Sequence, residues 1–323
     1  MIENIGIIVP TYNRHGTLAR QLDWLKHIGI QDVVVADGTA QPFPDATRWR
    51  HWYRHYPGMS MTQRLKTAAE QIRAPIVTLC PDDDYLCPGG LVRAARLLME
   101  DPGCASAQGR YISIENRRGS LRFGRLYDHA KSFSIDAATP AERLSTWMRS
   151  YMHSMYSLRR NDRMLAILRA FPSQVESFNL NELSFAFADA WYGRHFMFQD
   201  VLYMARDALV TFAPCPETQD LVRFQANFPE RYSRWIQEFT EAFAYNAGAA
   251  NAGEMKGLWE HAFAMYAEYE TLEQRRPMGR LRAIVPPKVK RVLKKLRAVR
   301  EPDSWIAQTD DFRQVRSHAL RFI

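Results

Sequence analysis

Features that would place the protein in several other structural classes are missing from its 323 residues. No apolar run approaches the roughly 18 to 20 residues that a membrane-spanning helix needs. The first residues, Met1 to Asn4, lack the basic start and longer apolar stretch of a signal peptide. The few cysteines form no CxxC pair and cannot build a disulfide scaffold, so we expect reduced thiols at Cys80, Cys87, Cys104 and Cys215. These absences favour a globular protein in the cytoplasm.

Positive charge is concentrated in one segment of the chain. The sequence has 43 Lys and Arg against 35 Asp and Glu, a formal net charge of +8. Residues 275–300 contain eleven Lys and Arg and no Asp or Glu, and the rest of the chain sums to −3. An anionic partner is therefore predicted for this segment and not for the whole protein.

The first ninety residues alternate between strand-like and helix-like patterns. Short apolar, β-branched runs at 4–9, 32–36 and 75–80 predict buried strands. Between them, apolar residues recur at helical spacing in 17–28 and 62–71. This alternation is typical of an α/β fold with a mostly parallel sheet and flanking helices.

Polar residues follow each of these predicted strands. Thr11 to Asn13 follow the first strand, Asp37 and Gly38 the second, and Asp82 to Asp84 the third. In parallel sheets ligands bind at the carboxyl ends of the strands, so these residues are candidates for one site. Three adjacent carboxylates repel one another, and Mg²⁺ or Mn²⁺ bridging to substrate phosphates would relieve that repulsion. The alternative is a solvated acidic turn that precedes a helix starting near Leu91.

Two further side chains, Asp37 and Arg64, have hydrogen-bonding groups that could bind a nucleotide. A carboxylate at Asp37 can accept hydrogen bonds from a ribose hydroxyl or a base N–H, although a turn residue before Gly38 is the simpler interpretation. Arg64, in the predicted helix before the acidic triplet, has the donor geometry to pair with a diphosphate. An arginine in such a helix is also compatible with a plain surface position.

Three strings of the sequence, in this order and at strand ends, resemble one enzyme family. They are IIVPTYNR at 7–14, VVVADGT at 33–39 and LCPDDDYLCPGGL at 79–91. Together they resemble the GT-A-fold, family-2-like nucleotide-sugar glycosyltransferases over roughly residues 1–210, most strongly in the first 95. The fold implied is a GT-A, Rossmann-like α/β domain, followed here by a helical C-terminal extension.

The resemblance implies roles for individual residues. The acidic triplet matches the family's DxD element, which implies metal binding by Asp82, Asp83 and Asp84. The nucleotide-sugar would be bound by Pro10, Thr11, Tyr12, Asp37, Arg64, Asp82 and Asp83. Two departures are visible, because Ala36 stands where many relatives have a second acidic residue, and Pro81 where some have the first aspartate of the motif.

Inverting members of the family carry an acidic pair about eleven residues before a glycine, at the start of a helix. Glu182 lies at that distance from Gly193 and would remove the proton of the acceptor hydroxyl. The family usually has aspartate there, and a helix cap is the alternative interpretation. Asp189, two helical turns further on, and Asp200 are the other candidate bases.

His153, Arg159 and Arg160 follow a run rich in Tyr and Met. They are candidates for lining the acceptor pocket or contacting the diphosphate, and a structural role for a lone histidine is the alternative.

The basic segment contains an amphipathic helical pattern. Over 288–300 the apolar positions recur at helical spacing, and the other positions are mainly Lys and Arg. This pattern indicates binding to an anionic membrane surface, with a packed helix bearing a solvated basic face as the alternative. We expect no nucleic acid partner, because helix-turn-helix, RNP and zinc motifs are absent from the sequence.

These inferences predict an inverting, metal-dependent glycosyltransferase of the hexosyltransferase type. The donor would be a nucleotide-sugar, most simply a UDP-sugar, and the acceptor a glycan or lipid-linked glycan in surface polysaccharide assembly. We expect a nucleotide-sugar-binding half at 1–104, an acceptor-binding half at 105–215 and a helical extension at 216–323. The alternative function is an inactive nucleotide- or glycan-binding scaffold anchored through its basic segment.

Overall fold

The computed structural model describes residues 1–117, 120–127, 133–173, 178–207, 221–248, 251–275 and 302–322. The predicted amphipathic helix over 288–300, and Cys215, lie outside these ranges. Within them, no helix combines the length and the apolar character needed to cross a membrane.

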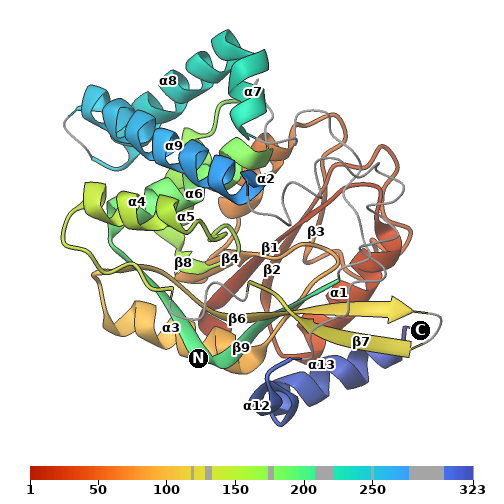
Figure 1. Ribbon diagram of the computed structural model, residues 1–323. Helices are drawn as coiled ribbons and strands as arrows, with labels where there is room; N and C mark the ends of the chain where they lie inside the picture. Colours follow the sequence, from red (N-terminus) through yellow and green to blue (C-terminus); the bar gives the residue numbers. More distant parts are fainter. Residues whose placement is uncertain are drawn as a thin grey trace.

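The described residues form one mixed sheet with helices around it (Figure 1). Its strands are β1 (Ile5–Thr11), β2 (Asp32–Asp37), β3 (Tyr53–His55), β4 (Ile76–Leu79), β5 (Tyr85–Leu86), β6 (Cys104–Arg117), β7 (Ser120–Arg125), β8 (Leu158–Arg160) and β9 (Arg194–Asp207). Their order is β3-β2-β1-β4-β8-β6-β9-β5, and β7 pairs with β6 outside this path.

The sheet is mostly parallel. β1 pairs in parallel with β2 and β4, and β2 pairs in parallel with β3. β8 is antiparallel to both β4 and β6, which restores the original direction in β6 and in β9, its parallel neighbour. Six of these nine strands therefore run in one direction, and the predicted α/β fold class is confirmed.

The helices of the α/β part are α1 (His15–His27), α2 (Met61–Ala69), α3 (Pro88–Glu100), α4 (Pro140–Arg149), α5 (Asn161–Ala170) and α6 (Phe178–Tyr192), after a short 3-10 turn at Ile2–Asn4. The helices predicted at 17–28, 62–71 and from near Leu91 are present as α1, α2 and α3, with bounds within one to three residues, whereas α4 and α5 were not predicted. Ser60 caps α2 and Thr139 caps α4, each in a capping box that satisfies the first free N–H groups of the helix.

The C-terminal part is helical. It contains α7 (Leu221–Asn227), α8 (Pro229–Asn246), α9 (Ala252–Arg275), α12 (Ser304–Ala307) and α13 (Asp310–Leu320). α8 packs against α5 and α9 packs against α4, so these helices cover the upper end of the molecule in Figure 1. α13 lies at the opposite end, where the Asp311 carboxylate accepts hydrogen bonds from the Gly89 backbone N–H at 3.1 Å.

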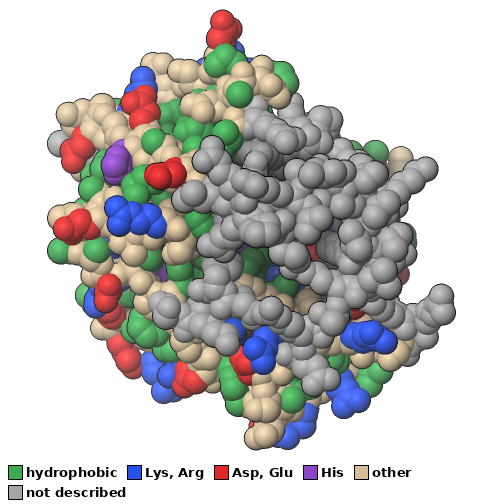
Figure 2. All heavy atoms as spheres, in the orientation of Figure 1, with side chains coloured by type: hydrophobic (Ala, Val, Ile, Leu, Met, Phe, Trp, Pro, Cys, Tyr) green, Lys and Arg blue, Asp and Glu red, His purple; other side chains and the backbone are tan. Residues whose placement is uncertain are grey.

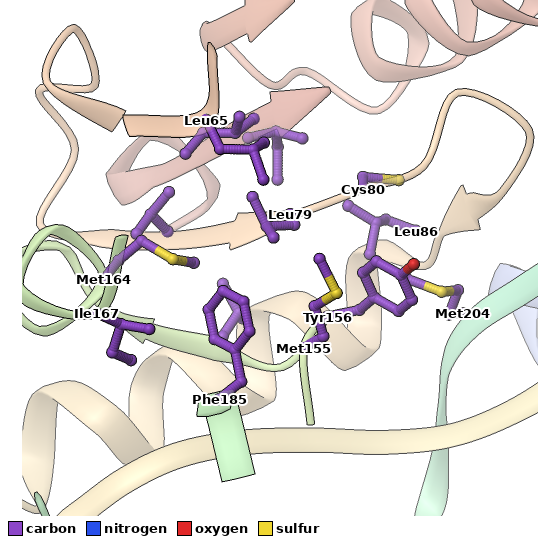
Figure 3. Packing of buried hydrophobic residues seen from close by; sticks show 14 of the residues in the cluster. Leu65, Leu79, Cys80, Leu86, Met155, Tyr156, Met164, Ile167, Phe185 and Met204 are labelled. Atoms are coloured by element: carbon purple, nitrogen blue, oxygen red, sulfur yellow. The ribbon is translucent and has the colours of Figure 1, made fainter. Parts of the chain in front are cut away.

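Part of the hydrophobic core lies where side chains of α2, α5 and α6 pack against β4 (Figure 3). Figure 3 shows Leu65 of α2, Leu79 of β4, Met164 and Ile167 of α5 and Phe185 of α6 packed together. All five are fully buried, and burying side chains of this size stabilises the fold by roughly 1.5–3 kcal/mol each. The sheet runs without interruption past Cys104, where β6 begins, so the division at residue 104 stays a proposal.

The described surface carries both charge signs. On the face drawn in Figure 2, Lys and Arg side chains are interspersed with Asp and Glu side chains. This mixture agrees with the small net charge of the sequence outside residues 275–300.

Candidate functional site

The parallel register brings the ends of β1 and β2 together. Thr11 lies directly opposite Asp37, and the Gly38 N–H donates to the Thr11 carbonyl at 3.1 Å. Just beyond, Asn13 adopts a left-handed conformation with φ of 56°, which turns the chain away from the strand. The Asn13 N–H donates to Thr39 Oγ1 at 2.8 Å, so the loops after β1 and β2 are held to each other.

The acidic triplet meets these loops from the end of β4. Thr11 Oγ1 donates to Asp82 Oδ2 at 2.6 Å. Arg14 Nη1 bridges the first two carboxylates, at 3.0 Å from both Asp82 Oδ1 and Asp83 Oδ2. Burial raises the pKa of Asp82 to about 6, although the Thr11 hydroxyl and the Arg14 charge act in the opposite direction. The site thus already contains one positive charge between two carboxylates.

Asp84 turns to the other side, toward the end of β9. Its Oδ2 accepts a hydrogen bond from Arg206 Nε and its Oδ1 one from the Asp207 N–H, both at 3.0 Å. Burial raises the pKa of Asp84 to about 7, against the lowering effect of Arg206. Burial lowers the pKa of Arg206, but Asp84 and the neighbouring tyrosines together raise it above its usual value, so the guanidinium stays charged. Asp84 is therefore part of a buried ion pair.

These orientations decide how the triplet could hold a metal ion. Within the part of the chain that the structure describes, no three His, Cys, Asp or Glu side chains are grouped as metal ligands. The three carboxylates are turned in two directions, and metal binding by Asp82, Asp83 and Asp84 stays a prediction. Asp83 Oδ1 is the one oxygen of the triplet that receives no hydrogen bond from another described residue. One carboxylate together with substrate phosphates is a usual way to bind Mg²⁺, and this donor set fits that mode.

Asp37 and Arg64 lie beneath the site. Asp37 is fully buried and accepts hydrogen bonds from the Thr39 N–H at 2.8 Å and from the Tyr53 hydroxyl at 2.7 Å, and it pairs with His15 at 3.2 Å. Burial opposes the charged form, but these hydrogen bonds together hold the pKa of Asp37 below its usual value. A carboxylate so fully bonded supports the loop and offers no exposed oxygen to a ligand.

Arg64 is likewise turned toward the backbone. Its Nη1 donates to the carbonyls of Thr11 and Ala36 at 2.9 and 2.7 Å, and only 6% of the residue is exposed. A Cβ at Gly38 would lie 2.5 Å from the Arg64 guanidinium carbon, so glycine is needed there for the arginine to fit. Arg64 thus ties the ends of β1 and β2 together.

Tyr12 is the open member of the predicted nucleotide-binding group. It follows β1 and 56% of it is exposed, whereas Thr11 is buried and Pro10 is half-buried. An exposed aromatic ring at the end of this strand is suited to stacking against a planar ligand.

Glu182 lies near the triplet in space, although it comes from the first turns of α6. The Tyr151 hydroxyl donates to Glu182 Oε1 at 3.0 Å, and His153 Nδ1 contacts the same oxygen. Tyr127 connects this group to the triplet, because its ring packs 5.4 Å from that of His153 and its hydroxyl accepts from Arg206 at 3.0 Å. The charges of both Glu182 and Asp84 act on Tyr127.

The two other candidate bases lie elsewhere. Asp189 is buried and binds Arg159 through two hydrogen bonds of 2.7 Å. Asp200 is on the exposed part of β9, paired with Arg93 at 2.7 Å and seven residues before the strand end that meets Asp84. Arg160 donates to the carbonyls of Cys104 and Asp101 at 2.8 Å, so neither predicted arginine turns toward the triplet. Of the three acids, only Glu182 is connected to the triplet, through His153, Tyr127 and Arg206.

Sequence reasoning missed several members of this group. Arg14 was part of a matched string without a role, and Arg206, Asp207 and Tyr127 were not singled out. One signal for Arg206 and Asp207 is present, since they end the apolar run 201–205 just as other polar residues end β1, β2 and β4.

No protein-family model matches the sequence, and no curated protein matches it either. Solved structures of S. aureus TarS do match the fold. The alignment with one TarS chain has a TM-score of 0.55 at 14% identity and covers 98% of this chain. The chain shares the fold of TarS. It spans about half, 53%, of that TarS chain.

Two further TarS structures were solved with ligands. Residues 1–349 of TarS in complex with UDP align with a TM-score of 0.52 at 14% identity, over 98% of this chain and 82% of that one. The same TarS fragment in complex with UDP-GlcNAc aligns with a TM-score of 0.53 at 13% identity, over 98% and 88%. At this identity the match establishes a common fold.

Proposed function

We propose that the protein is an inverting glycosyltransferase of the hexosyltransferase type that uses a nucleotide-diphosphate sugar, most simply a UDP-sugar. The observation that carries this proposal is the connection between Glu182 and the polar residues at the strand ends. It runs from Glu182 through His153, Tyr127 and Arg206 to Asp84. The fold shared with TarS, which was solved with UDP and UDP-GlcNAc, supports it. So does the resemblance of three strings to the family-2-like GT-A enzymes.

The donor would lie across the carboxyl ends of β1, β2 and β4. Tyr12 would stack on the base, while Pro10 and Thr11 shape the loop that carries it. Asp37 and Arg64 would act from below, by holding the loops after β1 and β2 in place through their buried hydrogen bonds. The buried hydrogen bond between Thr11 and Asp82 would keep the acidic triplet in register with this loop.

The diphosphate would lie beside Asp83. Its free Oδ1 would hold a Mg²⁺ or Mn²⁺ ion together with the donor phosphates, and Asp82 would contribute to the same surface. When bound, such an ion adds positive charge beside the departing diphosphate. Arg14 holds a fixed positive charge at 3.0 Å from both carboxylates, so it limits their mutual repulsion before the donor arrives.

Glu182 would take the proton of the attacking acceptor hydroxyl. A single displacement with one base gives inversion at the anomeric carbon, and general bases contribute roughly 10²- to 10⁴-fold to such steps. The acceptor proposed is a hydroxyl of a glycan or lipid-linked glycan, in surface polysaccharide assembly. The protein would then work in the cytoplasm at the inner membrane face, attached through the basic segment 275–300, most of which lies outside the described residues.

The direct test is UDP release from UDP-GlcNAc and other UDP-sugars in the presence of Mn²⁺, with water as the acceptor. We expect turnover by the wild-type protein, and a loss of about 10²-fold or more in Asp83→Asn and in Glu182→Gln. Asp200→Asn is the matched control, because its carboxylate is exposed and paired with Arg93, and it should retain full activity. NMR of the first sugar released should show the anomer opposite to that of the donor.

Two outcomes would contradict the proposal. Binding of a nucleotide-sugar without any turnover would favour the scaffold function. Full activity of Glu182→Gln would remove Glu182 from the reaction. The membrane assignment is tested separately, since replacing Lys294, Lys295 and Arg297 by Glu should abolish pelleting with anionic vesicles.

A further inference from the structure

Glu182 contacts two neighbouring side chains, Tyr151 and His153. The Tyr151 hydroxyl donates to Glu182 Oε1 at 3.0 Å, and His153 Nδ1 contacts the same oxygen atom. Oε2 accepts no hydrogen bond from the described residues. The two partners therefore engage one oxygen and leave the other oxygen of the carboxylate for a substrate.

Glu182 and its two partners differ in their exposure to solvent. The Tyr151 residue is 9% exposed and the Glu182 side chain 13%, whereas 37% of the His153 side chain is exposed. His153 Nε2 makes no hydrogen bond to the described residues, and its ring packs 5.4 Å from Tyr127 and 5.7 Å from Tyr151. The imidazole is thus held by two rings and one carboxylate, while protons from solvent can still reach it.

We infer that His153 is a positioning residue for Glu182 and that its protonation switches the base off. In the neutral state, the Nδ1 hydrogen of His153 and the Tyr151 hydroxyl orient the carboxylate so that Oε2 faces the acceptor. In the protonated state, a full positive charge against Oε1 stabilises the carboxylate and weakens it as a proton acceptor. This inference rests on the proposed function, since it assigns a second residue to the same step.

The groups that face His153 come from several elements. They are Glu182 of α6, Tyr151 after α4, Tyr127 after β7, Tyr266 of α9 through its contact with Tyr151, and, behind Tyr127, Arg206 of β9 with Asp84. Burial raises the pKa of Tyr127 and of Tyr151, so both stay neutral near pH 7. Histidine side chains ordinarily change charge between about pH 5 and 8, so the test covers this range.

Asp84 complicates a simple pH profile, because burial raises its pKa to about 7. The informative quantity is therefore the ratio of two rates measured at the same pH. His153→Asn is the matched variant, since the asparagine amide nitrogen takes the place of Nδ1 as a donor but does not titrate.

The experiment measures UDP release from UDP-GlcNAc by the wild-type protein, His153→Asn, His153→Ala and Glu182→Gln, with UDP binding followed by calorimetry. At pH 8 we expect His153→Asn to stay within about threefold of wild type, and His153→Ala to lose about tenfold or more because the carboxylate is no longer oriented. The ratio of wild-type to His153→Asn rates should fall about tenfold from pH 8 to about pH 5.5. His51→Asn, an exposed histidine on the loop before β3, should follow the wild-type profile.

The outcomes separate this inference from the proposed function. If the wild-type protein releases UDP and Glu182→Gln does not, but the rate ratio is constant with pH, the role of His153 is refuted and the function stands. Equal rates for His153→Ala and wild type at every pH would refute it as well. If no nucleotide-sugar binds or turns over, both proposals fail. Unchanged UDP affinity in the His153 variants excludes a simple folding defect.

Discussion

Arg159 and Asp189 form a two-point ion pair in the interior of the protein. Arg159 Nε and Nη2 donate to the two carboxylate oxygens of Asp189, each at 2.7 Å, and both side chains are almost completely buried. The pair joins β8 to α6 two helical turns beyond Glu182. Its geometry gives Asp189 a structural role, although its spacing along the helix also matched a catalytic one.

Replacing Asp189 by Ala should therefore affect stability and not chemistry. Removing one partner of a buried ion pair leaves an unpaired charge, and the free energy of unfolding should fall by about 3–5 kcal/mol. Urea denaturation measures this change, and UDP release per folded molecule should be unchanged. Glu182→Gln is the matched comparison, because it should lose activity at near wild-type stability. A stable but inactive Asp189→Asn would contradict this assignment.

Tyr12 and Tyr245 provide a second test, because both are exposed tyrosines. Tyr12 lies at the end of β1 and is 56% exposed, whereas Tyr245 is on α8 and is 88% exposed. Stacking of an aromatic ring on a base contributes roughly 1–3 kcal/mol, so Tyr12→Ala should weaken UDP binding by about tenfold or more. Tyr245→Ala should leave the affinity unchanged in the same calorimetric titration. Equal affinities of the two variants would remove Tyr12 from the donor site.

Arg14 should compete with a metal ion. Its Nη1 lies 3.0 Å from Asp82 Oδ1 and from Asp83 Oδ2, so the carboxylates are partly neutralised in the protein itself. In Arg14→Gln we expect Mn²⁺ alone to bind on the order of tenfold more tightly, because a unit charge next to the ion has been removed. Arg48→Gln, which breaks an exposed pair with Asp23, is the control and should not alter Mn²⁺ binding. Weaker Mn²⁺ binding in Arg14→Gln would show that Arg14 organises the site instead.

His195 should make stability depend on pH. It is completely buried between β6 and Trp147, and this burial lowers its pKa from 6.5 to about 4. Between those values the unfolded chain binds a proton that the folded protein does not. The free energy of unfolding should therefore fall as pH decreases from 6.5 to about 4, by about 3 kcal/mol from this group.

Chemical denaturation of wild type and His195→Phe at pH 7.5, 5.5 and 4.5 measures this contribution. The variant keeps a ring against Trp147 but cannot bind the proton, so its stability should decline less on acidification. Parallel curves for the two proteins would mean that His195 is not buried in its neutral form.

The strands of the parallel part could be predicted because burial on both faces leaves a direct pattern in the sequence. β1, β2 and β4 are runs of apolar, β-branched residues, and each appears within one or two residues of its predicted position. β3 was missed, since its three residues, Tyr53 to His55, are mostly polar and pair only at the edge of the sheet.

The candidate site was predictable only in part. Thr11, Asp37 and the acidic triplet follow strands that are neighbours in the sheet, so their meeting follows from topology. Arg206 forms a hydrogen bond with Asp84 although 122 positions separate the two residues in the sequence. Local sequence patterns carry no information about such a contact. The direction of each side chain could not be predicted either, so the sequence did not show that Asp84 turns toward Arg206 and away from Asp82 and Asp83.

By itself the sequence determined the fold class, the edge of the sheet where the polar residues collect, and the helix that carries Glu182. These features depend on local periodicity and on the fixed geometry of parallel strands. Only the tertiary structure decided which charges neutralise one another: Arg14 with Asp82 and Asp83, Arg206 with Asp84, Arg159 with Asp189. The physical reason is that a buried charge needs a partner within a few ångströms, and chain packing, not sequence distance, supplies it.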